Sequence, residues 1–72
     1  MSIVVDARGL SCPGPVMETV AAMSTAGAGD ELEILVDNAT ARDNVERTAR
    51  LRGWIVQVED RSGDSVLRLL KP

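Results

Sequence analysis

The order of apolar patterns along this chain constrains its fold more than any other feature. Runs that alternate apolar and polar or are β-branched, at 2–6 and 31–36, each precede a run with helical spacing. Period-two alternation is typical of half-buried strands, whereas apolar residues at i, i+4 and i+7 mark one helix face. Two further strand-like runs, 54–59 and 65–71, are joined by a turn at 60–64. The predicted order is βαβαββ.

The first helix is predicted to begin at Pro13, because proline fits the first helical position. Pro15 is also tolerated, because it falls in the first turn, where the N–H groups have no intrahelical partner. Val16, Val20 and Met23 form its expected buried stripe.

The second helix is predicted to run to about Arg52 and to end at Gly53, a residue type favoured just past helix ends. Residues 37–40, Asp-Asn-Ala-Thr, hold candidate N-caps at its start, and Thr40 with Asp43 resembles a capping box. Its apolar face consists of residues four apart: Ala41, Val45 and Ala49.

Strand–helix–strand connections form right-handed crossovers, so both helices should lie on the same side of the sheet. We therefore expect an α/β two-layer sandwich, with a mixed four-stranded sheet and two helices on one face. The 72 residues contain no linker, repeat or low-complexity segment, so residues 1–72 are interpreted as a single domain. A chain this short buries only about 60% of its unfolded surface and has no room for a deep substrate cavity.

The only cysteine, Cys12, stands where the first strand gives way to the first helix. A helix N-terminus presents unpaired N–H groups and the positive pole of the helix dipole, and both favour a thiolate. Pro13 and Pro15 stiffen this turn, and Gly14 has no side chain to cover the sulfur. Cys12 is therefore the candidate nucleophile, with a buried structural cysteine as the alternative.

Arg8 is the cation nearest to Cys12 in sequence and is a candidate to stabilise its anion. A solvated surface arginine is an equal alternative. Gly9 supplies the turn between them, and Asp6 is expected to cap or pair locally. The second helix also carries several arginines, which we interpret as a solvated surface: Arg42, Arg47, Arg50 and Arg52.

Several reaction types are excluded by residues that the sequence lacks. Without histidine there is no Cys–His dyad, and without a second cysteine there is no dithiol couple. One cysteine with scattered carboxylates has no recognisable metal-ligand spacing. Sulfur can attack another sulfur, or selenium, without an internal base. The candidate is thus a carrier that holds a persulfide on Cys12 and needs no cofactor beyond that covalent sulfur.

The composition limits which classes of partner and which cellular compartment are expected. A net charge of −3 and a single aromatic residue, Trp54, argue against binding nucleic acid. No apolar run approaches the roughly 18 residues of a membrane span, and the N-terminus does not resemble a signal peptide. A free reactive thiol suits a reducing compartment, so we expect a cytoplasmic protein.

Residues 6–15 read Asp-Ala-Arg-Gly-Leu-Ser-Cys-Pro-Gly-Pro, and this Arg-Gly-Leu element with Cys-Pro-x-Pro resembles the TusA family, also called SirA-like. The resemblance continues through 29–32, 37–38, 44–45 and Gly53, so it covers nearly the whole chain. It implies the same βαβαββ sandwich. The details at 37–38 and 44–45 resemble the YedF branch, which is linked to selenium metabolism.

By this resemblance Cys12 carries a persulfide received from a cysteine desulfurase or a rhodanese-type donor and passed to a protein acceptor. The supporting residues that it implies are Arg8, Gly9, Pro13, Gly14 and Pro15. Such a protein turns over only with both partners, as a sulfurtransferase-type carrier. The alternatives are a non-catalytic interaction or regulatory module and a selenium-handling carrier.

Relatives often carry basic residues one turn beyond the motif, where this chain has Val20 and Ala21, with Glu18 nearby. The resemblance therefore implies a dedicated partner with a less acidic docking face than the partners of those relatives.

Overall fold

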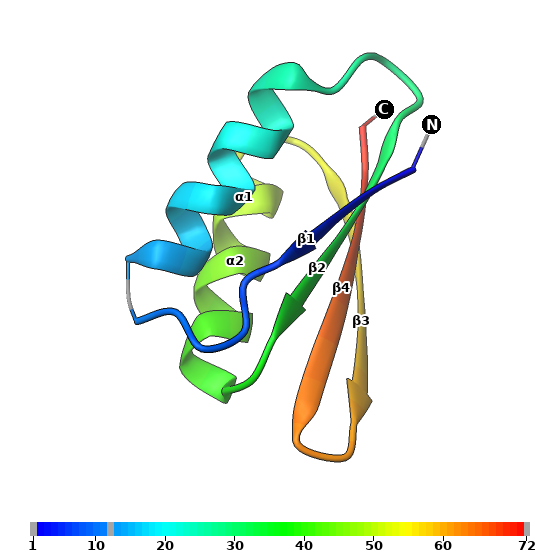
Figure 1. Ribbon diagram of the computed structural model, residues 1–72. Helices are drawn as coiled ribbons and strands as arrows, with labels where there is room; N and C mark the ends of the chain where they lie inside the picture. Colours follow the sequence, from blue (N-terminus) through cyan, green and yellow to red (C-terminus); the bar gives the residue numbers. More distant parts are fainter. Residues whose placement is uncertain (1, 12, 72) are drawn as a thin grey trace.

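The computed structural model describes residues 2–11 and 13–71 and confirms the order βαβαββ. Figure 1 shows a two-layer sandwich in which both helices lie on one face of a four-stranded sheet. The elements are β1 (Ser2–Asp6), α1 (Gly14–Thr25), β2 (Glu31–Val36), α2 (Ala39–Leu51), β3 (Ile55–Arg61) and β4 (Asp64–Leu70).

The sheet is mixed, with the order β1-β2-β4-β3. β1 is parallel to β2, whereas β4 is antiparallel to both of its neighbours, β2 and β3. Because β1 and β2 run in the same direction, their carboxyl ends meet at the same edge of the sheet. The segments that lead into α1 and α2 therefore start beside each other, and this places the candidate site.

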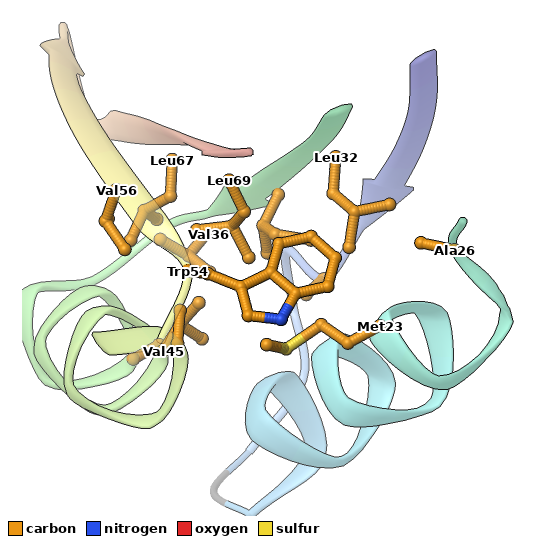
Figure 2. Packing of buried hydrophobic residues seen from close by; sticks show 13 residues of the cluster. Met23, Ala26, Leu32, Val36, Val45, Trp54, Val56, Leu67 and Leu69 are labelled. Atoms are coloured by element: carbon orange, nitrogen blue, oxygen red, sulfur yellow. The ribbon is translucent and has the colours of Figure 1, made fainter. Parts of the chain in front are cut away.

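The hydrophobic core lies between the inner face of the sheet and the two helices. Leu32, Ile34 and Val36 of β2 are fully buried, as their alternation predicts. Trp54 precedes β3 and belongs to the core, where Figure 2 shows its indole ring close to Met23 of α1. The fluorescence of this single tryptophan should therefore report on the packing of helix against sheet.

The buried side of α1 is displaced from the predicted stripe. Met23 is buried as expected, but Val16 and Val20 are only half-buried, and Pro15 and Thr19 take the buried positions. A threonine is accommodated there because its hydroxyl donates to the carbonyl oxygen of Pro15 at 2.8 Å. The apolar spacing alone gave no reason to place a threonine in the core.

The N-cap of α2 is one of the candidates at 37–40, but the predicted capping box is wrong. Asn38, rather than Thr40 with Asp43, caps the helix, and its side-chain oxygen accepts from the N–H of Ala41 at 2.7 Å. Gly53 follows the helix with a φ of +81°, as expected for the residue just past a helix end.

The closing hairpin has a tighter turn than the predicted residues 60–64. Asp60 pairs with Ser65 and Arg61 with Asp64 in the ladder, which leaves Ser62 and Gly63 as the turn.

Over residues 2–11 and 13–71, neither helix is long and apolar enough to cross a membrane.

Candidate functional site

The candidate site is the segment that joins β1 to α1, residues 7–13, called here the motif loop. Cys12, the predicted nucleophile, lies outside the described residues. The site is therefore described from the residues on either side of it, which include Ser11 and Pro13.

The first half of the motif loop is anchored to the end of β2. The N–H of Ala7 donates to the carbonyl of Leu35 at 2.8 Å and extends the β1–β2 ladder by one residue. Gly9 then turns the chain with a φ of +80°, a conformation that favours glycine. Its N–H donates to a carboxylate oxygen of Asp37 at 2.8 Å. The predicted turn at Gly9 is thus confirmed, with a specific partner.

Asp37 is a residue of this site to which the sequence assigned no role beyond that of a candidate helix cap. Its second carboxylate oxygen accepts from the side-chain amide of Asn38 at 3.2 Å. One carboxylate therefore joins the motif loop to the residue that caps α2. The parallel pairing of β1 and β2 was the available signal, since it brings an acid after β2 beside a loop after β1.

The start of α1 differs by one residue from the prediction, because Pro13 is the N-cap and the helix begins at Gly14. The N–H of Gly14 donates to the carbonyl of Ser11 at 2.7 Å, so it is not available to a neighbouring anion. Proline has no N–H, which removes Pro13 and Pro15 as donors. Met17 donates its N–H to the carbonyl of Pro13 at 3.0 Å, and Val16 carries the other N–H of this turn.

No acidic side chain lies in the first turn of α1, whose twelve residues are all described. The positive end of the helix dipole is therefore not offset by a carboxylate in that turn. This arrangement favours a negative charge beside the start of α1.

Gly14 also allows the motif loop to lie close against α1. A Cβ atom at this position would stand 3.1 Å from the Cβ of Leu10, which is tighter than ordinary contact. The absence of a side chain at Gly14 therefore fits a packing role as well as the predicted access to sulfur.

Arg8 is engaged with two carboxylates. Its Nε and Nη2 donate to the two oxygens of Asp6 at 2.9 and 3.0 Å, and Nη1 donates to Asp64 at 3.3 Å. The hydrogen bonds from Arg8 lower the pKa of Asp6 to about 2, and the pKa of Arg8 is raised by the same contacts. The local pairing expected of Asp6 is confirmed. Arg8 is an ion-paired residue rather than a simple solvated one, and its effect on Cys12 stays a prediction.

An open groove of about 320 Å³ runs beside the motif loop, between the starts of α1 and α2. Its described lining is uncharged and combines apolar groups with neutral hydrogen-bonding groups. The lining residues are Leu10, Ser11, Pro15, Val16, Asn38, Thr40, Ala41 and Asn44. Such a groove is suited to an uncharged, extended segment.

In the described part of the chain, no cluster of three or more histidine, cysteine or acidic residues could hold a metal ion.

The chain was compared with known proteins. The family model described as "Sulfurtransferase TusA" matches residues 3–71. A protein of Archaeoglobus fulgidus named "Putative sulfur carrier protein" is 36% identical over 58 residues, which are 79% of this chain and 80% of that protein. A relative in Methanocaldococcus jannaschii with the same description is 37% identical over 51 residues, 71% of this chain and 68% of that one.

The fold has a close match among solved structures. The crystal structure of a SirA-like protein from Desulfitobacterium hafniense superposes with a TM-score of 0.84 at 28% sequence identity. The match covers 96% of this chain and 95% of that one.

Proposed function

The chain belongs to the TusA sulfurtransferase family, and from that premise we propose that Cys12 accepts sulfane sulfur as a persulfide and passes it to a protein acceptor. The observation that carries this proposal is the position of the only cysteine, in Cys-Pro-Gly-Pro, directly before the N-cap residue of α1. The sulfur-carrier names of two relatives support it.

The proposed transfer needs only a thiolate. The Cys12 thiolate attacks the outer sulfur of a donor persulfide, R–S–SH. A bond forms between Cys12 Sγ and that sulfur while the donor S–S bond breaks, and the donor sulfur leaves with the bonding pair as a thiolate. The proton stays on the outer sulfur, and the oxidation state of the transferred sulfur does not change. An acceptor thiolate repeats the same displacement on the Cys12 persulfide, so no external oxidant or reductant is needed.

The described residues support this chemistry by position and charge. The start of α1 provides a positive pole without an acidic residue in its first turn. The bond from Gly9 to Asp37 holds the first half of the motif loop against β2. We infer that these features favour the thiolate of Cys12 and fix the chain that presents it.

The partners we propose are a sulfur donor of the cysteine desulfurase or rhodanese type and a protein acceptor. The uncharged groove beside the motif loop suits a partner segment that brings a cysteine to the site. The exposed side of α1 beyond the motif carries Met17, Glu18 and Ala21, with no cation. This favours a partner whose docking face is not strongly acidic. A carrier thiol that must stay reduced between transfers fits the cytoplasm, where we propose that the protein acts.

Intact mass spectrometry tests the proposal. The reduced protein is incubated with a cysteine desulfurase and cysteine, or with a rhodanese and thiosulfate. We expect the mass of one added sulfur, which dithiothreitol removes, and no addition to Cys12→Ser. The matched control is a Cys12→Ser/Ser62→Cys variant, which carries one thiol on the exposed β3–β4 turn.

We expect this control to acquire sulfur much more slowly than the natural chain. If Cys12 reacts freely with iodoacetamide but takes up no sulfur from either donor, the carrier role is contradicted. If Cys12 does not react with iodoacetamide in the native protein, it is a buried structural residue.

A further inference from the structure

β1 ends the sheet, and its outer side has no strand beside it within the described chain. The bond from the N–H of Ala7 to Leu35 shows that the backbone groups of Ala7 point toward β2. Successive residues of a strand alternate in this direction, so Ile3 and Val5 also point toward β2. The backbone donors and acceptors that face away from the sheet belong to Ser2, Val4 and Asp6.

This edge lacks the features that usually protect an exposed strand. β1 contains no lysine and no proline, and its pairing with β2 contains no bulge. Its one charged residue, Asp6, stands at the carboxyl end and is ion-paired with Arg8, so residues 2–5 carry no charge. Val4 is 61% exposed, while Ile3 and Val5 are half-buried at the border of the core. The opposite edge, β3, ends in consecutive charged residues, 59–61. The two edges of the sheet are therefore not equivalent, and β1 is the one open to further pairing.

We propose that two copies of this chain associate through β1, antiparallel, with the two-fold axis at Val4. In this register Val4 lies opposite the partner's Val4, and the two exchange both of their outward hydrogen bonds. Ser2 lies opposite the partner's Asp6, and these residues also exchange bonds. Every outward backbone group of β1 then has a partner.

The side chains agree with the same register. Val4 meets the partner's Val4 on the open face, and Ile3 meets the partner's Val5 on the helix face. Asp6 faces the partner's Ser2, so no like charges are opposed. A parallel, in-register pairing would instead place the two Asp6 carboxylates side by side, which is unfavourable.

The association would be weak and reversible, because five residues per copy form an interface smaller than that of stable complexes. The motif loop follows the carboxyl end of β1 (Figure 1). Antiparallel pairing would therefore place the two motif loops at opposite ends of the joined sheet. Association would therefore leave both carrier sites accessible to other proteins.

Sedimentation and amide NMR at increasing concentration of the natural chain test this directly. We expect a monomer–dimer equilibrium, with concentration-dependent shifts and protection at the amides of Ser2, Val4 and Asp6. The amides of Val5 and Ala7, which point toward β2, should be protected at every concentration. A natural chain that stays monomeric up to NMR concentrations overturns the proposal.

Two substitutions at Ser2 test the register with opposite signs. Ser2→Asp opposes the partner's Asp6 and should weaken the dimer by about two- to tenfold, whereas Ser2→Lys should strengthen it by a similar factor. Ser2 is exposed, so the fold should be retained in both variants, and Trp54 fluorescence checks it. If the two variants dimerise equally, the association uses another surface and the proposed register is wrong.

Val4→Pro is the stronger test, since proline removes an outward N–H without removing a bond to β2. We expect this variant to be monomeric, and Val4→Thr, which keeps the N–H, to dimerise. A Val4→Pro protein that keeps the Trp54 spectrum and still dimerises contradicts the proposal. Persulfide formation on Cys12 should not change in any of these variants, so failure here is distinct from failure of the proposed function.

Discussion

At the scale of single residues, two exposed carboxylates organise the chain around the motif. Asp37 accepts from Gly9 and from Asn38, and Asp6 accepts from Arg8. Neither contact is part of the hydrophobic core. Each instead sets the path or the charge of the chain next to the candidate site.

Replacing Asp37 with asparagine tests the anchor of the motif loop. We expect Asp37→Asn to lower the free energy of unfolding by about 1 kcal/mol, because the Gly9 N–H loses a charged acceptor. We also expect slower sulfur uptake by Cys12. Urea denaturation followed by Trp54 fluorescence measures the first effect, and mass spectrometry the second. Asp43→Asn, which removes a carboxylate from the exposed surface of α2, is the control and should change neither. Equal effects of the two variants would refute a special role for Asp37.

The ion pair between Asp6 and Arg8 predicts that the stability of the folded protein depends on pH. The pKa of Asp6 falls from an ordinary value of 3.8 to about 2 in the folded protein, chiefly through the side-chain hydrogen bond from Arg8. Its contribution to stability is therefore present above about pH 4 and is lost as the pH falls toward 2. We expect Arg8→Ala to be less stable than the natural chain at neutral pH and to approach it near pH 2. NMR titration of the Asp6 carboxyl in both proteins checks the cause.

Arg8→Ala also tests the role that the sequence suggested for this arginine. Because the guanidinium donates to Asp6 and Asp64, we expect the pKa of Cys12 to be nearly the same in the variant. The pH dependence of alkylation measures it. A clear upward shift of the midpoint would instead support a direct contribution of Arg8 to the thiolate.

At the scale of elements, the start of α1 determines what the motif can do. Its N-cap is Pro13, and its first turn contains Pro15, a glycine whose N–H donates to Ser11, and no acidic residue. The helix dipole therefore acts with few individual N–H donors. This arrangement should lower the pKa of a nearby thiol without requiring a strong local hydrogen bond.

We accordingly expect the pKa of Cys12 to lie below the value of about 8.5 for a free cysteine. The rate of iodoacetamide alkylation as a function of pH gives the midpoint. The single thiol of the Cys12→Ser/Ser62→Cys variant, on an exposed turn, is the reference and should titrate near the free value. A Cys12 midpoint at or above that reference would mean that desolvation outweighs the helix terminus.

The contact between Gly14 and Leu10 predicts the effect of adding one methyl group. We expect Gly14→Ala to lower the free energy of unfolding by about 1 kcal/mol, because the motif loop must move away from α1. Gly27→Ala is the matched control, since its Cβ would meet only an ordinary 3.6 Å contact with Asp30. It should be neutral or slightly stabilising. Urea titrations measure the free energy of unfolding of both variants. Equal values would show that Leu10 can move away from an added methyl group without a loss of stability.

Features of helices and strands that depend on local sequence patterns were predicted well, whereas contacts between distant elements were not predicted. The alternation in β2 identified its buried face, and Gly53 identified the end of α2. The capping box predicted for α2 was wrong because several candidates near its start, including Asn38 and Thr40, are suitable caps and only the local geometry distinguishes them. The bonds from Gly9 to Asp37 and from Arg8 to Asp64 join distant segments. Their prediction needs the strand order, which periodicity alone does not supply.

At the scale of the whole molecule, the charged groups are distributed unevenly around the candidate site. The groove beside the motif loop is uncharged, and the exposed side of α1 carries Glu18 without a cation. Charge on a docking surface acts mainly on the rate of association. The surface of α1 should therefore affect the choice of partner more than the chemistry of transfer.

A lysine on α1 tests this view. We expect Ala21→Lys to speed sulfur exchange with acidic partners, more at low salt than at high salt. Ala21 is exposed, whereas Val20 is half-buried, so the single change avoids the core. Gln57→Lys makes the same change in net charge on the far face of the sheet and should have little effect. Similar acceleration by both variants would point to net charge rather than to a docking surface on α1.

The position of β4 has a consequence for the order of folding. β4 is the last strand along the chain, yet it lies in the middle of the sheet, between β2 and β3. Among the described residues β3 has no other strand neighbour, so it cannot join the sheet until residues near 70 have been synthesised. The candidate thiol leaves the ribosome early, but the sheet beneath it closes last. A nascent or truncated chain would then carry an ordinary cysteine, and the activated one would be a property of completed molecules.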